Sequence, residues 1–307
     1  MIKRILTAAL LLAGIAAFAQ EDAASFRSKY ERQVRMVGYA GVGVETILDR
    51  WEAAFPEDPY MLEGRFRHCF AKSRSSHIEA KYQPKFLGSE PVFSLKDSTG
   101  RDIYYYEEDF FVDSLFARSQ KAIDKAIALQ PAELAWRIDK AGALLIYEKE
   151  SPDLTCAEVL KMIDYQASAR PQWTHYGEEM PEGTLAEAVL EYCFTFFRYG
   201  SPGGYEAFRK ISERMLKLYP GNAEYMNNLG SYYLVCQSSP KKALKWYGKA
   251  LKADPLNYTA AHNCVLIARR NKDVKLEKKY LPTLIQATQD EIERKGYEAR
   301  LEALGKK

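Results

Sequence analysis

Apolar residues recur at helical spacing along most of this 307-residue chain, and prolines close the segments that contain them. Because proline cannot continue a helix, each such proline is expected to end one helix before the next begins. The register predicts six helix pairs, the first ending at Pro56 and the last beginning near Tyr258. The five stop prolines are Pro56, Pro131, Pro171, Pro220 and Pro255.

The segment 223–255 shows the pattern most clearly. A short break at residues 237–240 divides it into two amphipathic helices. Gly230 lies inside the first helix, where glycine costs about 1 kcal/mol, so we expect it to let the second helix approach closely. The apolar stripes of the two helices are Met226, Leu229 and Tyr233, followed by Ala243, Tyr247, Ala250 and Leu251.

This segment resembles the tetratricopeptide repeat, although an ordinary helical hairpin is the alternative. Met226 stands where the family has Trp. One extra residue before Pro240 shifts the second helix by one position relative to the family's pattern. Against a unit of about 34 residues, the stop prolines mark successive units with insertions. The resemblance implies an all-α fold, a right-handed superhelix of about six antiparallel helix pairs. The family's Leu-Gly, Tyr, Ala and Pro positions fall on Leu229-Gly230, Tyr233, Ala250 and Pro255.

The largest insertion, residues 73–109, is expected to form a small β-hairpin within one helical repeat domain, residues 20–307. Residues 92–97 and 101–106 have strand composition and flank a turn that contains Gly100. A two-stranded hairpin is marginal alone in water, so we expect it to pack against the helices. The residues expected to make that contact are Phe93, Leu95, Ile103 and Tyr105.

The first 19 residues have the pattern of a secretory signal. A short basic head is followed by an apolar run, residues 5–18, which is shorter than the roughly 20 residues that a bilayer span needs. Cleavage is expected after Ala19. The sequence thus predicts a periplasmic or secreted protein with no integral membrane segment in its mature chain.

The charge balance bears on the class of partner, and the cysteine pattern bears on disulfide bonds. The chain has 44 Lys and Arg against 41 Asp and Glu, and this near balance gives no electrostatic case for nucleic acid or an acidic membrane. Its cysteines are an odd number and widely spaced, so buried free thiols are expected, with one bridge as the alternative. They are Cys69, Cys156, Cys193, Cys236 and Cys264.

The sequence shows no spacing of residues that predicts catalysis, a cofactor or a metal site. The four histidines are scattered, and the glycine-rich residues 38–43 follow a helix rather than a strand, which predicts a helix–helix turn. A second insertion, residues 172–183, carries Trp173, His175 and Glu178-Glu179, which would either line a pocket or form a surface loop held by the tryptophan. We therefore expect no enzyme.

Binding is the function that the resemblance implies. In the tetratricopeptide family the first helix of each pair lines a concave groove, and the ligand is commonly a protein or an extended peptide. The lysines of members that bind chaperone tails are missing from these groove positions. By resemblance, the groove residues are Glu224, Asn227, Ser231 and Leu234 in the fifth pair, and Thr259, His262, Leu266 and Arg269 in the sixth.

The insertion offers a further candidate surface, and two other functions compete with peptide binding. Tyr104 and Tyr106 would contact a ligand if the hairpin lies beside the groove, whereas the alternative is a flap that shields the second helix pair. A glycan-binding envelope protein is the second reading, because 13% of the residues are aromatic and rings stack on sugars. An uncharacterised hydrolase is the third.

Overall fold

The computed structural model describes residues 22–148 and 151–305. The expected signal, residues 1–19, lies outside this range. The described chain divides into two compact units, which are treated separately: residues up to His77 with Asp109–Trp136, and Ile78–Glu108 with the remainder from Arg137.

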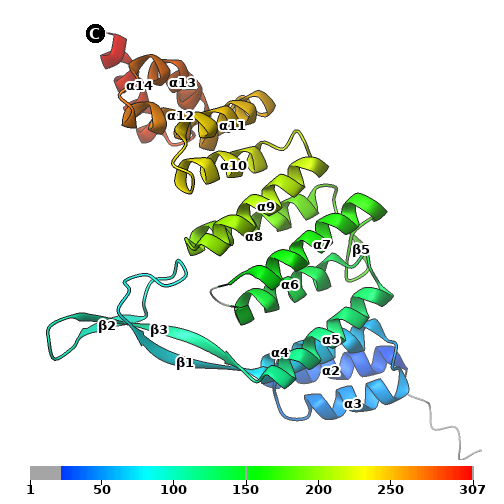
Figure 1. Ribbon diagram of the computed structural model, residues 1–307. Coiled ribbons are helices and arrows are strands. Elements are labelled where there is room, and N and C mark those ends of the chain that lie inside the picture. Colours follow the sequence, from blue (N-terminus) through cyan, green and yellow to red (C-terminus); the bar gives the residue numbers. More distant parts are fainter. Residues whose placement is uncertain (1–21, 149–150, 306–307) are drawn as a thin grey trace, which may run out of the picture. The chain divides into compact units, whose positions relative to one another are not determined.

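The first unit contains two helix pairs (Figure 1). A glycine-rich turn joins the first two helices, as the sequence predicts: Gly38 ends one and Gly43 begins the next, both with positive φ. Trp51 and Tyr30 fill the core of the first pair, and Tyr30 also touches the second pair at Gly64. The helices are α2 (Ala23–Val37), α3 (Val44–Ala54), α4 (Pro59–Ser73) and α5 (Asp113–Leu129).

The second unit holds the remaining helix pairs, so the six expected pairs are confirmed (Figure 1). The first turn of α6 lies in the first unit. The helices are α6 (Leu134–Glu148), α7 (Asp153–Ala169), α8 (Thr184–Tyr199), α9 (Pro202–Leu218), α10 (Ala223–Val235), α11 (Pro240–Ala253), α12 (Tyr258–Arg270) and α13 (Val274–Ala287), with α14 (Glu291–Gly305) after the last pair.

Two helices, α13 and α14, form the C-terminal end of the described chain. The helix α13 ends at Ala287, and Asp290 accepts a hydrogen bond from the Glu293 backbone N–H (2.7 Å), which begins a new helix. The new helix α14 buries Leu304 against Leu281 and Leu284 of α13. It therefore covers the last repeat, the role expected of a capping helix.

Three of the five stop prolines have a common structural basis. Phe55, Gln130 and Tyr219 each precede such a proline, and each has an extended φ between −139° and −125°. A following proline disfavours the helical conformation at these positions. Each backbone N–H still bonds to the carbonyl four residues earlier, so the helical hydrogen bonding continues up to the residue before the proline.

The contact between α10 and α11 confirms the expected close approach at Gly230. A Cβ atom at this position would lie 2.4 Å from the Tyr247 ring, which is fully buried. Ala243 and Ala250 flank the tyrosine on α11 and are equally buried. The Tyr247 ring occupies the space that a side chain at position 230 would fill.

The 73–109 insertion forms a three-stranded sheet rather than a simple hairpin. Its strands are β1 (Arg74–Lys81), β2 (Phe93–Lys96) and β3 (Asp102–Phe111), in the order β1-β3-β2. The predicted hairpin is β2 with β3, which pair antiparallel from Phe93 opposite Tyr105 to Lys96 opposite Asp102. The strand β1 was not predicted, and the boundary between the two units crosses it.

The second insertion is a surface loop held by its tryptophan. It forms a short ribbon of β4 (Thr174–His175) and β5 (Glu178–Glu179). Trp173 is buried, its indole N–H donates to the Gln166 side chain, and its ring lies near Tyr165. Since His175 and both glutamates are exposed, the loop does not gather them into a pocket.

The five cysteines are free, as expected, and Cys236 alone among them is partly exposed. Burial raises the pKa of Cys156 to about 11 and the pKa values of Cys193 and Cys264 to about 12. These thiols therefore stay protonated at neutral pH and are poor nucleophiles.

The close approach at Gly230 predicts opposite effects for two Gly→Ala substitutions. Gly230→Ala should destabilise the chain by about 1–3 kcal/mol, because the new methyl group overlaps the Tyr247 ring. Gly248→Ala in α11 meets no atom within 4 Å and should stabilise the chain by about 0.5–1 kcal/mol. Urea unfolding of the two variants measures both changes, and equal shifts would contradict the packing.

Candidate functional site

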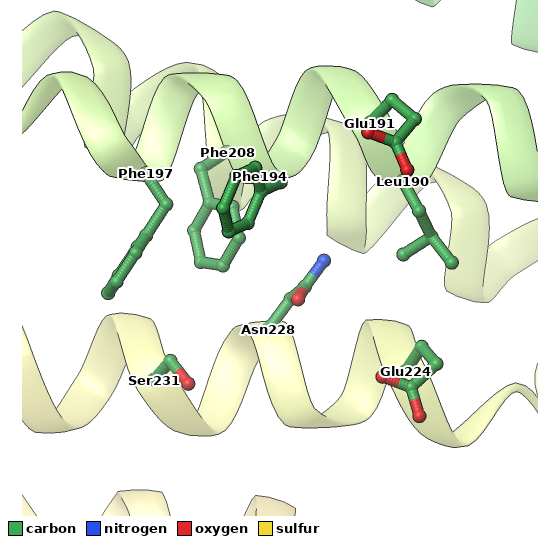
Figure 2. Close-up of a pocket in the computed structure, with 8 residues that line it drawn as sticks. All are labelled: Leu190, Glu191, Phe194, Phe197, Phe208, Glu224, Asn228 and Ser231. Carbon is green, nitrogen blue, oxygen red and sulfur yellow. The ribbon is translucent and has the colours of Figure 1, made fainter. Parts of the chain in front are cut away.

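A groove lies between α8 and α10 and has a volume of about 410 Å³ (Figure 2). The helix α9 supplies one residue at its base. The residues that line the groove are Leu190, Glu191, Phe194 and Phe197 of α8, Phe208 of α9, and Glu224, Asn228 and Ser231 of α10.

The aromatic run of α8 is divided between the core and the groove. Tyr192 and Phe196 face inward, and the Tyr192 hydroxyl donates to the Ile138 carbonyl (2.8 Å). Phe194 and Phe197 are three residues apart, so they share the other face of the helix. Phe197 packs on the buried ring of Phe208, with centroids 4.9 Å apart, whereas Phe194 is 62% exposed. The groove thus has an aromatic floor beside an exposed ring.

The opposite wall is polar and is held by hydrogen bonds. The Ser231 hydroxyl lies 3.2 Å from that of Tyr247, and the Glu224 carboxylate accepts a hydrogen bond from the Asn257 side chain (2.9 Å). Glu191 faces Glu224 across the other end of the groove, away from Phe197 (Figure 2). One end is therefore aromatic and the other acidic.

Asn228 stands between these ends and points toward α8 (Figure 2). Its side-chain Nδ2 is buried and makes no hydrogen bond to a nitrogen or oxygen atom of the described residues, and the Cys193 thiol beside it is only a weak acceptor. A buried donor without an acceptor costs about 1–3 kcal/mol. A ligand carbonyl in the groove would provide the missing acceptor if the amide rotated toward it.

Of the four groove residues expected on α10, Glu224 and Ser231 line the groove and two do not. Asn227 is 2% exposed and donates to the Asn257 side chain (2.7 Å), so its expected groove position is wrong. Leu234 packs against the core of the fifth pair. Sequence reasoning missed Asn228, which lies four residues after Glu224 and three before Ser231, the spacing of one helix face.

The four residues expected on α12 do not join this groove. Thr259 is exposed, Leu266 is partly buried, and the His262 ring stacks on Tyr258 (centroids 5.6 Å apart). Arg269 lines a separate hollow of about 570 Å³ with Glu293, Gly296, Tyr297 and Arg300.

Arg269 and Arg300 in that hollow already have an anionic partner. Both guanidinium groups donate to Glu277, a buried carboxylate on α13, at 2.7 and 2.9 Å. The hydrogen bonds from Arg300 and Arg269 lower the pKa of Glu277, so the carboxylate stays ionised at neutral pH. The arrangement joins α12, α13 and α14, and it leaves the two arginines less available to a ligand.

The two tyrosines expected to contact a ligand have different positions. Tyr106 is 3% exposed and its hydroxyl donates to the Gln83 carbonyl (2.7 Å), so it has no free surface and that expectation is wrong. Tyr104 is partly exposed. The hairpin does not pack through Phe93 and Leu95 either, which are 44% and 55% exposed.

The insertion instead approaches α8 through a tight turn at residues 86–89. Leu87 and Gly88 both have positive φ, and Phe86 and Ser89 exchange backbone hydrogen bonds across the turn. A Cβ atom on Gly88 would lie 2.6 Å from the Arg198 carbonyl, near the end of α8. The turn therefore contacts α8 near its C-terminal end, the end at which Phe197 is also located.

The described residues hold no cluster of three or more His, Cys, Asp or Glu side chains that would suit a metal ion. Within the same part of the chain, no helix is long and apolar enough to span a bilayer. The absence of an enzymatic site stays a prediction.

Protein-family models and curated proteins give no match to the sequence. Several solved structures are similar to this chain over most of its length, at low sequence identity. PilF of Pseudomonas aeruginosa is 15% identical, with a TM-score of 0.40, over 62% of this chain and 77% of that chain. PilW, a widely conserved type IV pilus biogenesis factor, is 9% identical, with a TM-score of 0.35, over 87% and 93%. The TPR2AB domain of yeast Sti1, in a complex with pHSP90, is 10% identical, with a TM-score of 0.30, over 92% and 96%.

The fold assignment rests on the helix pairs themselves. Six antiparallel pairs follow one another in the described residues, and the second helices of the first five pairs stop before prolines. In the fifth pair a glycine of the first helix receives an aromatic ring of the second. The chain is an all-α, tetratricopeptide-like helical repeat protein with a small β-sheet insertion.

Proposed function

We propose that this protein is an exported helical-repeat scaffold that binds an extended segment of another protein in the groove between α8 and α10. The observation that carries the proposal is Phe194, a ring that is 62% exposed beside an aromatic floor. Exposed aromatic side chains next to a pocket are typical anchors of protein interfaces.

The groove has the chemistry that an extended peptide requires. Its volume of about 410 Å³ lies within the range of ligand pockets, about 300–1,000 Å³. An apolar side chain of the peptide would pack between Phe194 and Phe197, while Asn228 pairs with a backbone carbonyl. Glu191 and Glu224 favour a basic residue at the other end. A peptide with an apolar and a basic residue therefore fits best.

Binding of an extended peptide is favoured over glycan binding by the arrangement of the rings. Sugar recognition needs free, coplanar aromatic faces, and in the groove Phe197 is covered by Phe208. The exposed sheet ring of Phe93 stacks on Tyr105 at 4.5 Å, which covers one face of each. In this proposal the protein has no catalytic role.

The proposal that the protein is exported rests on residues 1–19, which have a basic head, an apolar run and a small-residue cleavage site at Ala17–Ala19. We expect the mature chain to begin at Gln20 and to be recovered from the periplasm or the medium. Intact-mass measurement of the protein from each cell fraction checks this. A chain that retains Met1–Ala19 or carries a lipid would overturn the proposed location and leave the groove unaffected.

The groove proposal predicts which side chains a bound peptide needs. Peptides selected from a random library on the wild-type chain should bind Phe194→Ala about tenfold more weakly, because an aromatic anchor is lost. Asn228→Ala should weaken binding about fivefold through one lost hydrogen bond. Titration calorimetry with a selected peptide measures both changes.

Phe110→Ala is the matched control for this experiment. Phe110 is an exposed phenylalanine of β3, outside the groove, and its removal should leave peptide affinity unchanged. Equal losses in Phe110→Ala and Phe194→Ala would place the peptide elsewhere. A library that yields no binder, together with glycan binding that Phe194→Ala abolishes, would replace this proposal by the glycan alternative.

We propose that the turn at residues 86–89 helps to form the aromatic end of the groove, which predicts different effects for two glycines. Gly88→Ala should push the turn away from Arg198, weaken the selected peptide and speed amide exchange at Phe86–Ser89. Gly100→Ala has similar backbone strain, because φ is +83° at Gly100 and +74° at Gly88, but its new methyl group meets no atom within 4 Å. It should therefore change neither peptide affinity nor amide exchange at Phe86–Ser89. Identical behaviour of the two variants would show that the turn does not dock on α8.

A further inference from the structure

Basic side chains are concentrated in one part of the second unit. Residues 240–280 contain eleven Lys and Arg but only three Asp and Glu, although the whole chain has 44 against 41. The near balance of the whole sequence thus hides a strongly basic segment. It comprises α11, α12 and the first half of α13.

The lysines of this segment lie on the outer faces of α11 and α13. On α11, Ala243, Tyr247 and Ala250 are buried, and at 100° per residue the lysines fall on the opposite side. Glu277, Leu281 and Leu284 mark the buried side of α13. The lysines, all exposed, are Lys241, Lys242, Lys245, Lys249 and Lys252 of α11 and Lys275, Lys278 and Lys279 of α13. We call these eight residues the basic face.

The two helices that carry this face both border α12. Leu251 of α11 and Tyr280 of α13 each pack against both core clusters that surround α12, so the second helices of the fifth and sixth pairs flank the same helix. We treat the outer sides of these two neighbouring second helices together as one basic face. It shares no residue with the groove between α8 and α10.

Acidic groups of the chain do not neutralise the basic face. None of its eight lysines forms an ion pair with another described residue, in contrast to the pairs Lys140–Glu158 and Lys81–Glu108 elsewhere. The three acidic residues of the segment are occupied, since Asp254 accepts from Asn257, Asp273 begins α13, and Glu277 is held by two arginines. The positive charge of the face thus remains for an external partner.

We infer that the basic face docks on the surface of a bilayer that contains anionic phospholipids. A cluster of lysines is attracted to the negative charge of such a surface without requiring a shaped pocket. Trp246 lies at the edge of this face, partly exposed, with the Lys249 ammonium 3.8 Å from its ring centroid. A tryptophan beside lysines is typical of surfaces that lie at the membrane interface.

Two features of the basic face favour a bilayer over a nucleic acid. The face contains lysine alone, whereas recognition of individual phosphates and bases favours the planar arginine fork. Its lysines also lie on the outer sides of the two helices, opposite their buried stripes, and single-stranded nucleic acid is bound mainly by grooves with aromatic stacking platforms. The inference goes beyond the proposed peptide binding, because it gives the scaffold a place to attach while its groove stays open.

Co-sedimentation with lipid vesicles tests this inference on the chain as purified after export. It should bind vesicles of phosphatidylcholine with phosphatidylglycerol at least tenfold more tightly than vesicles of phosphatidylcholine alone. Binding should fall at least tenfold between about 0.05 M and about 0.5 M salt, because exposed charges are screened. Comparable binding to both kinds of vesicle would overturn the inference.

Charge reversal distinguishes binding through the basic face from binding through the net charge of the whole chain. The double variant Lys241→Glu and Lys245→Glu should reduce binding to the anionic vesicles at least tenfold. The control is Lys121→Glu with Lys125→Glu on α5, an exposed pair with the same spacing and the same change in net charge. The control should bind as the wild type does, and unchanged helical circular dichroism should show that both variants fold.

Two outcomes of charge reversal would contradict the basic face as a membrane surface. Equal loss in both double variants would mean that net charge alone drives binding. Tighter salt-dependent binding to a DNA duplex than to the anionic vesicles, lost in Lys241→Glu with Lys245→Glu, would assign the face to nucleic acid instead. The selected peptide should bind both double variants as it binds the wild type, so a failure here leaves the groove proposal intact.

Discussion

The packing of the Tyr247 ring on Gly230 is the contact on which the C-terminal repeats depend. It brings α10 and α11 closer than any side chain at Gly230 would allow, and it fixes how both helices are turned about their axes. On α10 this rotation presents Asn228 and Ser231 to the groove, and the Tyr247 hydroxyl meets Ser231. On α11 it turns the lysines outward. One buried contact therefore sets the positions of both surfaces to which function is assigned.

Asn257 transmits that geometry from the fifth pair to the sixth. Its side-chain oxygen caps α12 through the Ala260 N–H and also accepts a hydrogen bond from Asn227, while its amide donates to Glu224. This network explains why Asn227 is buried although its neighbour Asn228 lines the groove. It also holds the Glu224 carboxylate in place at the acidic end of the groove, so cap and binding wall are built from the same residues.

The proposed peptide binding and the proposed membrane binding are compatible because they use different helices. The groove uses the first helices α8 and α10, and the basic face uses the second helices α11 and α13. Helix pairs bury their apolar stripes between the two helices, which leaves each helix one outer side. A repeat scaffold can therefore hold a partner on one side and attach through the other.

The sequence by itself determined the features that depend on neighbouring residues. Helix pairs, their ends before prolines such as Pro220, and the close approach at Gly230 follow from local conformational limits and from apolar spacing. These predictions were confirmed. The free, buried cysteines were expected for a similar reason, since each lies in an apolar helical stretch.

Only the tertiary structure decided the features that depend on distant partners. The choice between Asn227 and Asn228 at the groove was set by Asn257, thirty residues away. The burial of Tyr106 depends on the Gln83 carbonyl, and the turn at Gly88 depends on the end of α8. The basic face appears only when α11 and α13 flank the same helix, because an overall charge balance says nothing about where the charges lie.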